Sequence, residues 1–220
     1  MARQPQSTVS QRRSPRLYLI TPPVEDSITL TGALADVLDT IDVAAVLLRL
    51  PDADEKSLLG RIEALAAMVQ DRGVALLLEG RSELAANCRA DGAHLTGVVA
   101  FASALGCLKP GRIAGAGGLE TRHDAMLAGE AGADYVMFGE PHPNGGRPAF
   151  GTILERVAWW TELFLPPCVG FAARPDEIAA LAAAGADFIA VDHVLSSDRR
   201  RAIAAAQAAA ERLAIPELVP

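Results

Sequence analysis

Histidine and acidic side chains recur at the ends of the short apolar runs that we expect to form strands. Three of the four histidines lie at or just after such an end, with three acidic residues nearby: His94, His142, His193, Glu79, Glu140 and Asp192. Imidazole and carboxylate groups are the usual general acids and bases, and they also bind metals. If the fold gathers them, they form an acid–base cluster or a metal site. If it does not, they have separate structural roles.

Arginine and glycine residues at other strand ends suit an anionic ligand. Arg49 follows an apolar run, and a guanidinium group can bind a phosphate through two parallel hydrogen bonds. The alternative for Arg49 is a salt bridge at the rim to Glu79, Asp52 or Asp54. The run Gly115-Ala116-Gly117-Gly118 lets backbone N–H groups approach a phosphate, although a simple turn would use the same residues.

Two kinds of segment alternate from Arg16 onward. Short apolar runs with little in/out alternation predict strands that are covered on both faces, as in a parallel sheet. These runs are Arg16–Ile20, Val43–Arg49, Val74–Leu78, Gly92–Leu95, Arg112–Gly115, Asp134–Gly139, Cys168–Gly170 and Phe188–Val191. Between them, apolar residues follow a helical spacing, for example at Leu58, Ile62, Leu65, Ala66 and Val69.

Eight strand–helix units predict a single (β/α)8 TIM barrel near the small end of its size range. Two of the expected helices end on the same sequence, Ala-Gly-Ala-Asp, at residues 131–134 and 184–187, and residues 90–93 are a looser copy. A doubly wound open sheet is the alternative, but Thr21-Pro22-Pro23 is not the glycine-rich first turn that it needs. We expect the barrel to span residues 16–215 and residues 1–15 to form a disordered tail.

The composition excludes several classes of protein. The chain has 220 residues, of which 50% are hydrophobic and 21% charged, so it can bury a core without disulfides. A net charge of -7 argues against a nucleic-acid partner, and no apolar run is long enough to span a membrane. We expect no secretory signal, because the first residues lack an apolar stretch, and the sequence has no Cys-x-x-Cys pair. We therefore expect a cytoplasmic protein, with homo-oligomerisation left open.

The sequence resembles the thiamine phosphate synthases and their relatives, the thiazole tautomerases, which are both (β/α)8 barrels. The resemblance covers roughly residues 17–213. It rests on segments that occur in the family's order and spacing, namely Leu17–Thr21, Leu48-Arg49, Ala90–Leu95, Ile113–Gly115, Gly132–Gly139 and Gly185–Val191.

The resemblance implies a phosphorylated small-molecule substrate. In the synthases, a pyrimidine pyrophosphate held by magnesium loses its pyrophosphate, and the nitrogen of a thiazole phosphate attacks the resulting carbocation. Barrel active sites lie at the carboxyl ends of the strands. We therefore expect substrate to contact Arg49, His94, Gly115, Gly117, Gly118, Gly139, Arg147, Arg174 and Asp192.

The chain departs from the synthase pattern where that pattern handles pyrophosphate. Gly80 and Val99 stand in place of the aspartates that hold magnesium in the family, so we expect no tight magnesium site and no other cofactor. The alternative is that Glu79 and Glu140 substitute for these aspartates, if their side chains converge. Arg49 alone remains of a Gln-x-Arg-x-Lys pattern on the second strand, and Gly117 and Asp192 stand where the family has serines. The resemblance thus implies a divergent thiamine-phosphate-synthase-like transferase of thiamine biosynthesis.

Two other functions remain open. A thiazole tautomerase-like isomerase would shift a proton by means of the histidine that follows the sixth strand. Here Glu140 follows Gly139 directly and His142 lies further on, so the catalytic candidates are His142, Glu140 and Glu79. The other possibility is a non-catalytic barrel that binds a phosphorylated ligand or a partner.

Overall fold

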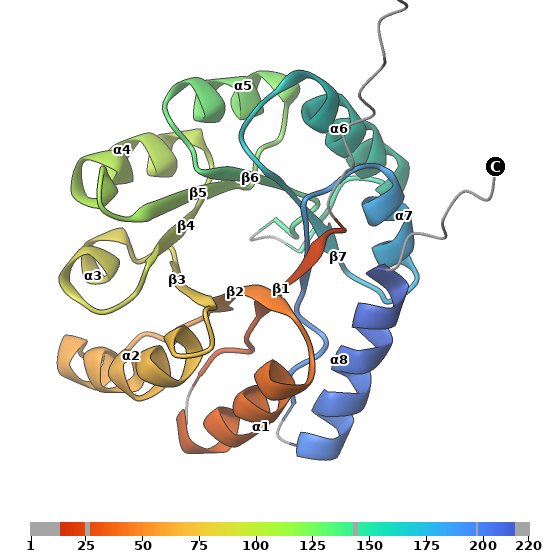
Figure 1. Cartoon of the computed structure of the whole chain (residues 1–220). Helices are drawn as coiled ribbons and strands as arrows, with labels where there is room; N and C mark the ends of the chain where they lie inside the picture. The colour runs from red at the N-terminus through yellow and green to blue at the C-terminus, as the bar shows by residue number, and fades with distance from the viewer. Residues whose placement is uncertain (1–13, 25–26, 143–144, 197, 214–220) are drawn as a thin grey trace, which may run out of the picture.

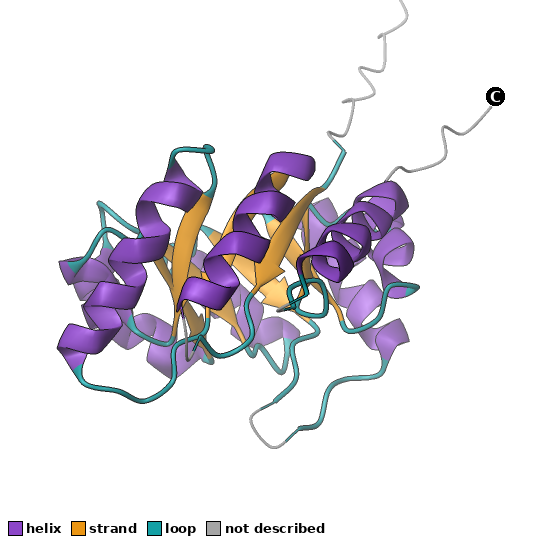
Figure 2. Cartoon of the chain, turned by 90° about the horizontal axis from the view of Figure 1, so that it is seen from below, coloured by secondary structure: helices purple, strands orange, loops and turns teal. Residues whose placement is uncertain are grey.

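The chain folds into a closed barrel of parallel strands inside a ring of helices (Figure 1). This computed structural model describes residues 14–24, 27–142, 145–196 and 198–213. Strands β1 to β8 pair in sequence order, and β8 pairs with β1 to close the barrel. The side view shows the strands as a central layer with helices outside them (Figure 2). The predicted (β/α)8 TIM barrel is confirmed, whereas most of the predicted tail, residues 1–13, lies outside the described residues.

Each strand is followed by one helix within the described part of the chain. The strands are β1 (Arg16–Ile20), β2 (Val43–Leu48), β3 (Ala75–Glu79), β4 (Gly92–Thr96), β5 (Ile113–Gly117), β6 (Tyr135–Phe138), β7 (Cys168–Ala172) and β8 (Phe188–Val191). The helices are α1 (Ser27–Thr40), α2 (Glu55–Gln70), α3 (Ser82–Asn87), α4 (Val98–Leu108), α5 (Arg122–Glu130), α6 (Phe150–Leu163), α7 (Glu177–Ala183) and α8 (Arg199–Leu213). The predicted strands differ from these by two residues at most.

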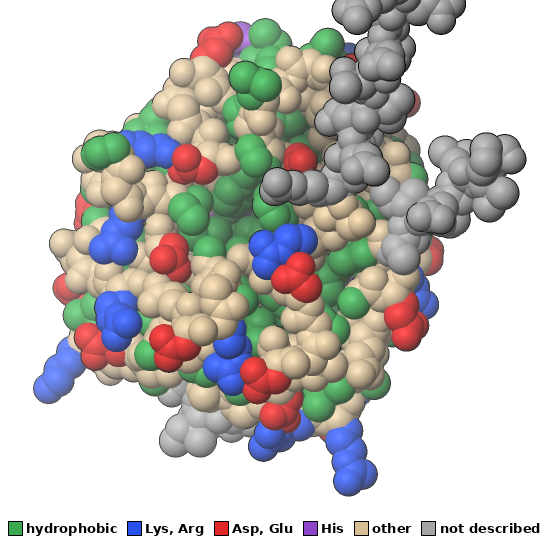
Figure 3. Space-filling view, viewed as in Figure 1, with side chains coloured by type: hydrophobic (Ala, Val, Ile, Leu, Met, Phe, Trp, Pro, Cys, Tyr) green, Lys and Arg blue, Asp and Glu red, His purple; other side chains and the backbone are tan. Residues whose placement is uncertain are grey.

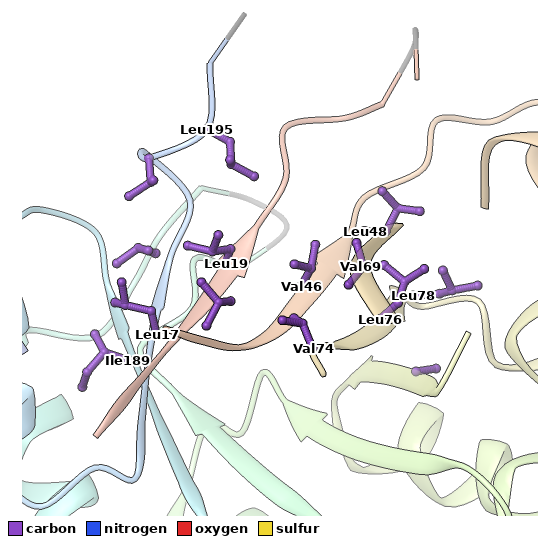
Figure 4. Close-up of a cluster of buried hydrophobic side chains, with 14 of the residues drawn as sticks. Leu17, Leu19, Val46, Leu48, Val69, Val74, Leu76, Leu78, Ile189 and Leu195 are labelled. Carbon is purple, nitrogen blue, oxygen red and sulfur yellow. The ribbon is translucent and has the colours of Figure 1, made fainter. Parts of the chain in front are cut away.

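The strands separate two apolar cores, which is why their sequences do not alternate. One set of strand side chains packs outward against the helices, including Leu17, Leu19, Val46, Leu48 and Ile189, and meets helix residues such as Val69 of α2 (Figure 4). The other set fills the barrel, and it comprises Tyr18, Ile20, Ala45, Leu47, Leu77, Tyr135, Met137, Val169, Phe171 and Ala190. Parallel strands that are buried on both faces need apolar residues at successive positions.

An aspartate precedes every second strand and binds the start of the strand before it. Asp91, Asp134 and Asp187 each accept a hydrogen bond from a backbone N–H at 2.7 or 2.8 Å, donated by residues at the starts of β3, β5 and β7: Leu76, Ala114 and Cys168. Asp42 before β2 instead binds the Arg16 guanidinium of β1, with two bonds of 2.8 and 2.7 Å. In the recurring Ala-Gly-Ala-Asp sequence, the glycine therefore ends a helix and the aspartate binds the backbone of the preceding strand.

The two ends of the barrel differ in character. Where the strands begin, the centre of the barrel is hollowed into a mostly apolar pit of about 300 Å³ lined by Tyr18, Ala45, Leu77, Tyr135, Val169 and Phe188 among others (Figure 3). The carboxyl ends of the strands carry the polar residues expected to function, including Arg49, Glu79 and His94. No helix in the described part of the chain is long and apolar enough to cross a membrane.

We predict that Asp91→Ala lowers the free energy of unfolding by ~1–3 kcal/mol, because the Leu76 N–H loses its acceptor at a partly buried position. Asp52→Ala is the control, because the Asp52 side chain is 99% exposed and its pair with Arg81 lies at the surface. It should change stability by less than about 0.5 kcal/mol. Urea unfolding of both variants measures the difference, and equal effects would contradict the structural role of Asp91.

Candidate active site

The centre of the candidate site is a histidine–glutamate pair at the mouth of the barrel. His94 lies on β4 and Glu140 follows β6, and His94 Nε2 is 2.9 Å from Glu140 Oε1. The His94 side chain is fully buried, whereas 13% of the Glu140 side chain is exposed. Both residues are strand-end candidates in the sequence. The fold brings their side chains together over β5, the strand that lies between β4 and β6. An imidazole and a carboxylate in contact can hold and move a proton.

Glu140 is held as a carboxylate by donors on two sides. Its Oε2 accepts a hydrogen bond of 3.0 Å from the Gly118 N–H, and Gly118 has a φ of 60° that favours glycine. Burial raises the pKa of Glu140, but His94, the Gly118 N–H and the charge of Arg49 together bring that pKa below its ordinary value. The mouth of the barrel therefore presents a negative charge at Glu140 near neutral pH.

Two tyrosines continue the hydrogen-bonded chain into the barrel. The Tyr135 hydroxyl lies 2.8 Å from His94 Nδ1, and the Tyr18 hydroxyl lies 2.9 Å from that of Tyr135. Burial raises the pKa of both tyrosines far above the ordinary value, so both phenols stay protonated. Sequence analysis did not select either residue, although these are the two tyrosines of the chain and both lie on predicted strands.

The glycines of β5 make room for this chain of side chains. A Cβ atom at Gly117 would overlap Glu140 Oε2 and His94 Nε2, and one at Gly115 would overlap the Tyr135 ring. Gly139, with a φ of 96°, turns the chain immediately before Glu140. The structure thus gives three of the predicted substrate-binding glycines a packing role at the site, and their contact with substrate stays a prediction.

Arg49 lies at the end of β2 between two acidic residues. Its Nε donates to Glu79 Oε1 at 3.1 Å, and its Nη1 lies 3.5 Å from Asp192 Oδ2. Asp52 pairs with Arg81 instead, and Asp54 accepts a hydrogen bond from Ser57 at the start of α2. The Arg49 side chain is 26% exposed, so a ligand at the mouth can reach it.

Arg147 has a partner on each of its guanidinium nitrogens. It donates to the carbonyl oxygens of Gly139 and Phe171, each at 3.1 Å, and to the Glu177 carboxylate at 2.9 Å. Glu177 is buried and also accepts from the Ala173 N–H. This arrangement ties the segment after β6 to the segment after β7 and so fixes the turn that carries Glu140. Glu177 was not among the residues that the sequence indicated. Its position at the start of α7 is the one sequence feature that marks it.

Three other candidates lie away from the His94–Glu140 pair. His142 is half-buried, and its Nδ1 is 3.9 Å from Glu120 Oε1. Arg174 is largely exposed and pairs with Asp176 and Glu177. His193 is exposed after β8, next to Asp192. The structure therefore does not join the three strand-end histidines into one cluster.

The three carboxylates around the site, among the residues that the structure describes, are paired within the protein rather than free to hold a magnesium ion. Mg²⁺ prefers oxygen ligands and usually takes one or two carboxylates. Glu79 and Asp192 are both paired with Arg49, while Glu140 is bonded to His94 and Gly118. Among the described residues, no three His, Cys, Asp or Glu side chains converge as a metal site.

Comparisons with known proteins show which family the chain resembles. The sequence profile of the family described as "Thiamine monophosphate synthase" matches residues 17–195. The "Thiamine-phosphate synthase" of Rhodospirillum centenum is 42% identical over 179 residues, covering 80% of this chain and 86% of that protein. That of Hyphomonas neptunium is 38% identical, covering 84% and 87% of the two chains.

A solved structure shares the fold. The thiamine phosphate pyrophosphorylase from Pyrococcus furiosus superposes with a TM-score of 0.71, at 20% sequence identity. The match covers 92% of this chain and 98% of that one, so the whole barrel is common to both.

We predict that Gly117→Ala lowers the free energy of unfolding by ~1–3 kcal/mol, because the added methyl group overlaps both members of the His94–Glu140 pair. Gly106→Ala in α4 is the control, since a Cβ atom there meets nothing within 4 Å. It should be neutral or stabilising by up to ~1 kcal/mol, as expected for alanine in a helix. Thermal and urea unfolding measure both variants. If Gly117→Ala is as stable as the wild type, the pair is not locked by packing.

Proposed function

The chain belongs to the thiamine monophosphate synthase family, and we propose that it acts in thiamine biosynthesis as a transferase of the thiamine phosphate synthase type. In the proposed reaction, the bond between the pyrimidine methylene carbon and pyrophosphate breaks, and the thiazole nitrogen forms a new bond to that carbon. The observation that carries the proposal is the 42% identity to a thiamine-phosphate synthase over 80% of the chain.

The charges at the mouth suit the cation that this reaction forms. Glu140 is a carboxylate fixed by His94 and Gly118, and Glu79 and Asp192 lie on either side of Arg49. A preorganised negative charge stabilises positive charge that develops on the pyrimidine methylene and then on the thiazole ring. The bond exchange needs no proton transfer, so in this reaction Glu140 acts by its charge.

Arg49 is the cation placed to receive a phosphate group. Its two acidic neighbours are about one-third exposed, at 38% for Glu79 and 31% for Asp192, so both can be solvated when a phosphate takes the guanidinium. Arg147, by contrast, is committed to Glu177 and two carbonyl oxygens. We derive no step through magnesium, because Glu79, Asp192 and Glu140 are each paired within the protein in this structure.

A specific observation favours a second candidate, a proton shift of the thiazole tautomerase type. Glu140 occupies the position that directly follows Gly139, and its contact with a buried imidazole gives a base with a fixed partner. Glu140 would accept a proton from one ring position and return it to another, with no net transfer. A barrel that only binds a phosphorylated ligand is the third possibility.

We predict that the purified chain forms thiamine phosphate and one equivalent of pyrophosphate from the pyrimidine pyrophosphate and the thiazole phosphate. Glu140→Gln should slow the formation of thiamine phosphate at least tenfold, because the carboxylate charge is lost.

The assay is run over a magnesium titration, and we expect no tight magnesium-dependent pyrophosphate binding. Isotope exchange from D₂O into the thiazole carboxylate phosphate, without coupling, would favour the tautomerase. Binding without either reaction would leave a binding protein and contradict the transferase.

We predict that Arg49→Ala weakens binding of thiazole phosphate about tenfold or more, because charge-assisted hydrogen bonds to phosphate contribute roughly 1.5–3 kcal/mol each. Arg72→Ala is the control, since Arg72 follows α2 and pairs with Asp39 away from the mouth. Calorimetric titration compares the variants with the wild type. Equal affinities for wild type and Arg49→Ala would show that Arg49 serves only its pairs with Glu79 and Asp192.

A further inference from the structure

Four polar side chains form a continuous hydrogen-bonded column from the barrel interior to its mouth. The order is Tyr18, Tyr135, His94 and Glu140, with separations of 2.9, 2.8 and 2.9 Å. The surrounding barrel wall is apolar, and it includes Ile20, Leu47, Leu77, Met137, Val169 and Phe171. Within the described residues, no buried side-chain nitrogen or oxygen lacks a partner, so the column satisfies its own polar groups.

With a neutral imidazole, the direction of each bond follows from the carboxylate at one end. Glu140 is ionised and can only accept, so His94 Nε2 must carry a hydrogen and donate it to Oε1. The ring nitrogen Nδ1 of a neutral imidazole is then an acceptor, and its partner is the Tyr135 hydroxyl. Because the Tyr135 hydroxyl donates its hydrogen to Nδ1, its oxygen accepts the hydrogen bond from the Tyr18 hydroxyl. The opposite tautomer would set the Nε2 lone pair against a carboxylate.

We infer that Tyr135, supported by Tyr18, is a positioning residue that holds the His94 ring in the Nε2–H tautomer and aims it at Glu140. His94 then acts as a fixed donor behind the carboxylate, and Glu140 is the member of the pair that faces a substrate. The exposure of the two side chains agrees with this division, since His94 is fully buried and Glu140 is 13% exposed. The inference concerns the resting protein and does not depend on which reaction the site performs.

Packing restricts the rings to this arrangement. The His94 and Tyr135 rings stack with centroids 5.7 Å apart and planes 13° apart, and the Tyr18 ring meets Tyr135 edge-on at 5.9 Å. A Cβ atom at Gly115 would overlap the Tyr135 ring, so this ring occupies the space of a missing side chain. Since burial keeps both phenols protonated, each remains able to donate.

Imidazole nitrogen resonances of the full-length ¹⁵N-labelled chain test the inference without any substrate. Long-range proton–nitrogen spectra are recorded at mildly alkaline pH, and His94→Gln identifies the His94 signals. In the wild type we expect a protonated Nε2 and an unprotonated, hydrogen-bonded Nδ1. Tyr135→Phe should move the Nδ1 signal to the position of a nitrogen without a hydrogen-bond donor. The exposed His123 serves as an internal reference.

Tyr18→Phe is the matched control, because it removes one hydroxyl of the column and leaves the Tyr135–His94 bond in place. Its effect on Nδ1 should be smaller than that of Tyr135→Phe. A second variant, Glu140→Gln, should keep the Nε2–H tautomer, because Tyr135 still donates to Nδ1 and the amide oxygen can accept from Nε2. This variant keeps the test available if Tyr135→Phe does not fold.

Three results would overturn the inference. They are a protonated Nδ1 in the wild type, an Nδ1 signal that Tyr135→Phe leaves unchanged, and a tautomer preference that is lost in Glu140→Gln while Tyr135 is still present. Failure of the enzymatic assay has no bearing on these signals, so the two proposals fail separately.

Discussion

Polar groups inside an apolar barrel must bond to one another, and this constraint determines the candidate site. Two phenols and an imidazole lie where water is scarce, and each has only its neighbours in the column as partners. The constraint requires a carboxylate at the open end, which Glu140 supplies. It also requires space, which Gly115 and Gly117 supply by lacking side chains. The two glycines, the two tyrosines and the His94–Glu140 pair therefore form one structural unit, whose residues lie on or directly after β1, β4, β5 and β6.

The fold was predictable because its signals are local. Apolar runs such as Val43–Leu48 and Phe188–Val191 mark strands without reference to the rest of the chain, and the strand boundaries follow closely. The Ala-Gly-Ala-Asp sequences mark helix ends for the same reason, since Gly132 and Gly185 adopt φ values of 98° and 99°. The additional role of Asp134 and Asp187 was not predictable, because it depends on a backbone N–H in the preceding strand.

The site was predictable only as a set of strand ends. Strand ends place Arg49, Glu79, His94, Glu140 and Asp192 at one end of the barrel, and the structure pairs them as Arg49 with two acids and His94 with Glu140. The sequence suggested the pair of Arg49 with Glu79 as one alternative, which the structure confirms. It shows neither the other pairings nor the tyrosines behind His94, because those contacts join residues about 40 to 140 positions apart. Arg147 illustrates the same limit, since its main partner, the buried Glu177, belongs to α7, which lies beyond α6 and β7 in the chain. An arginine in a loop gives no indication of whether it will bind a ligand or its own chain.

The aspartates that precede alternate strands divide the barrel into quarters. Asp42, Asp91, Asp134 and Asp187 each connect the strand that follows them to the strand before, so β1–β2, β3–β4, β5–β6 and β7–β8 are each cross-linked at their starts. The side-chain bonds of these aspartates do not link neighbouring quarters to each other. The two members of the His94–Glu140 pair belong to different quarters, because His94 lies on β4 and Glu140 lies just after β6. The hydrogen bond between His94 and Glu140 therefore joins two quarters at the opposite end of the barrel from the aspartates.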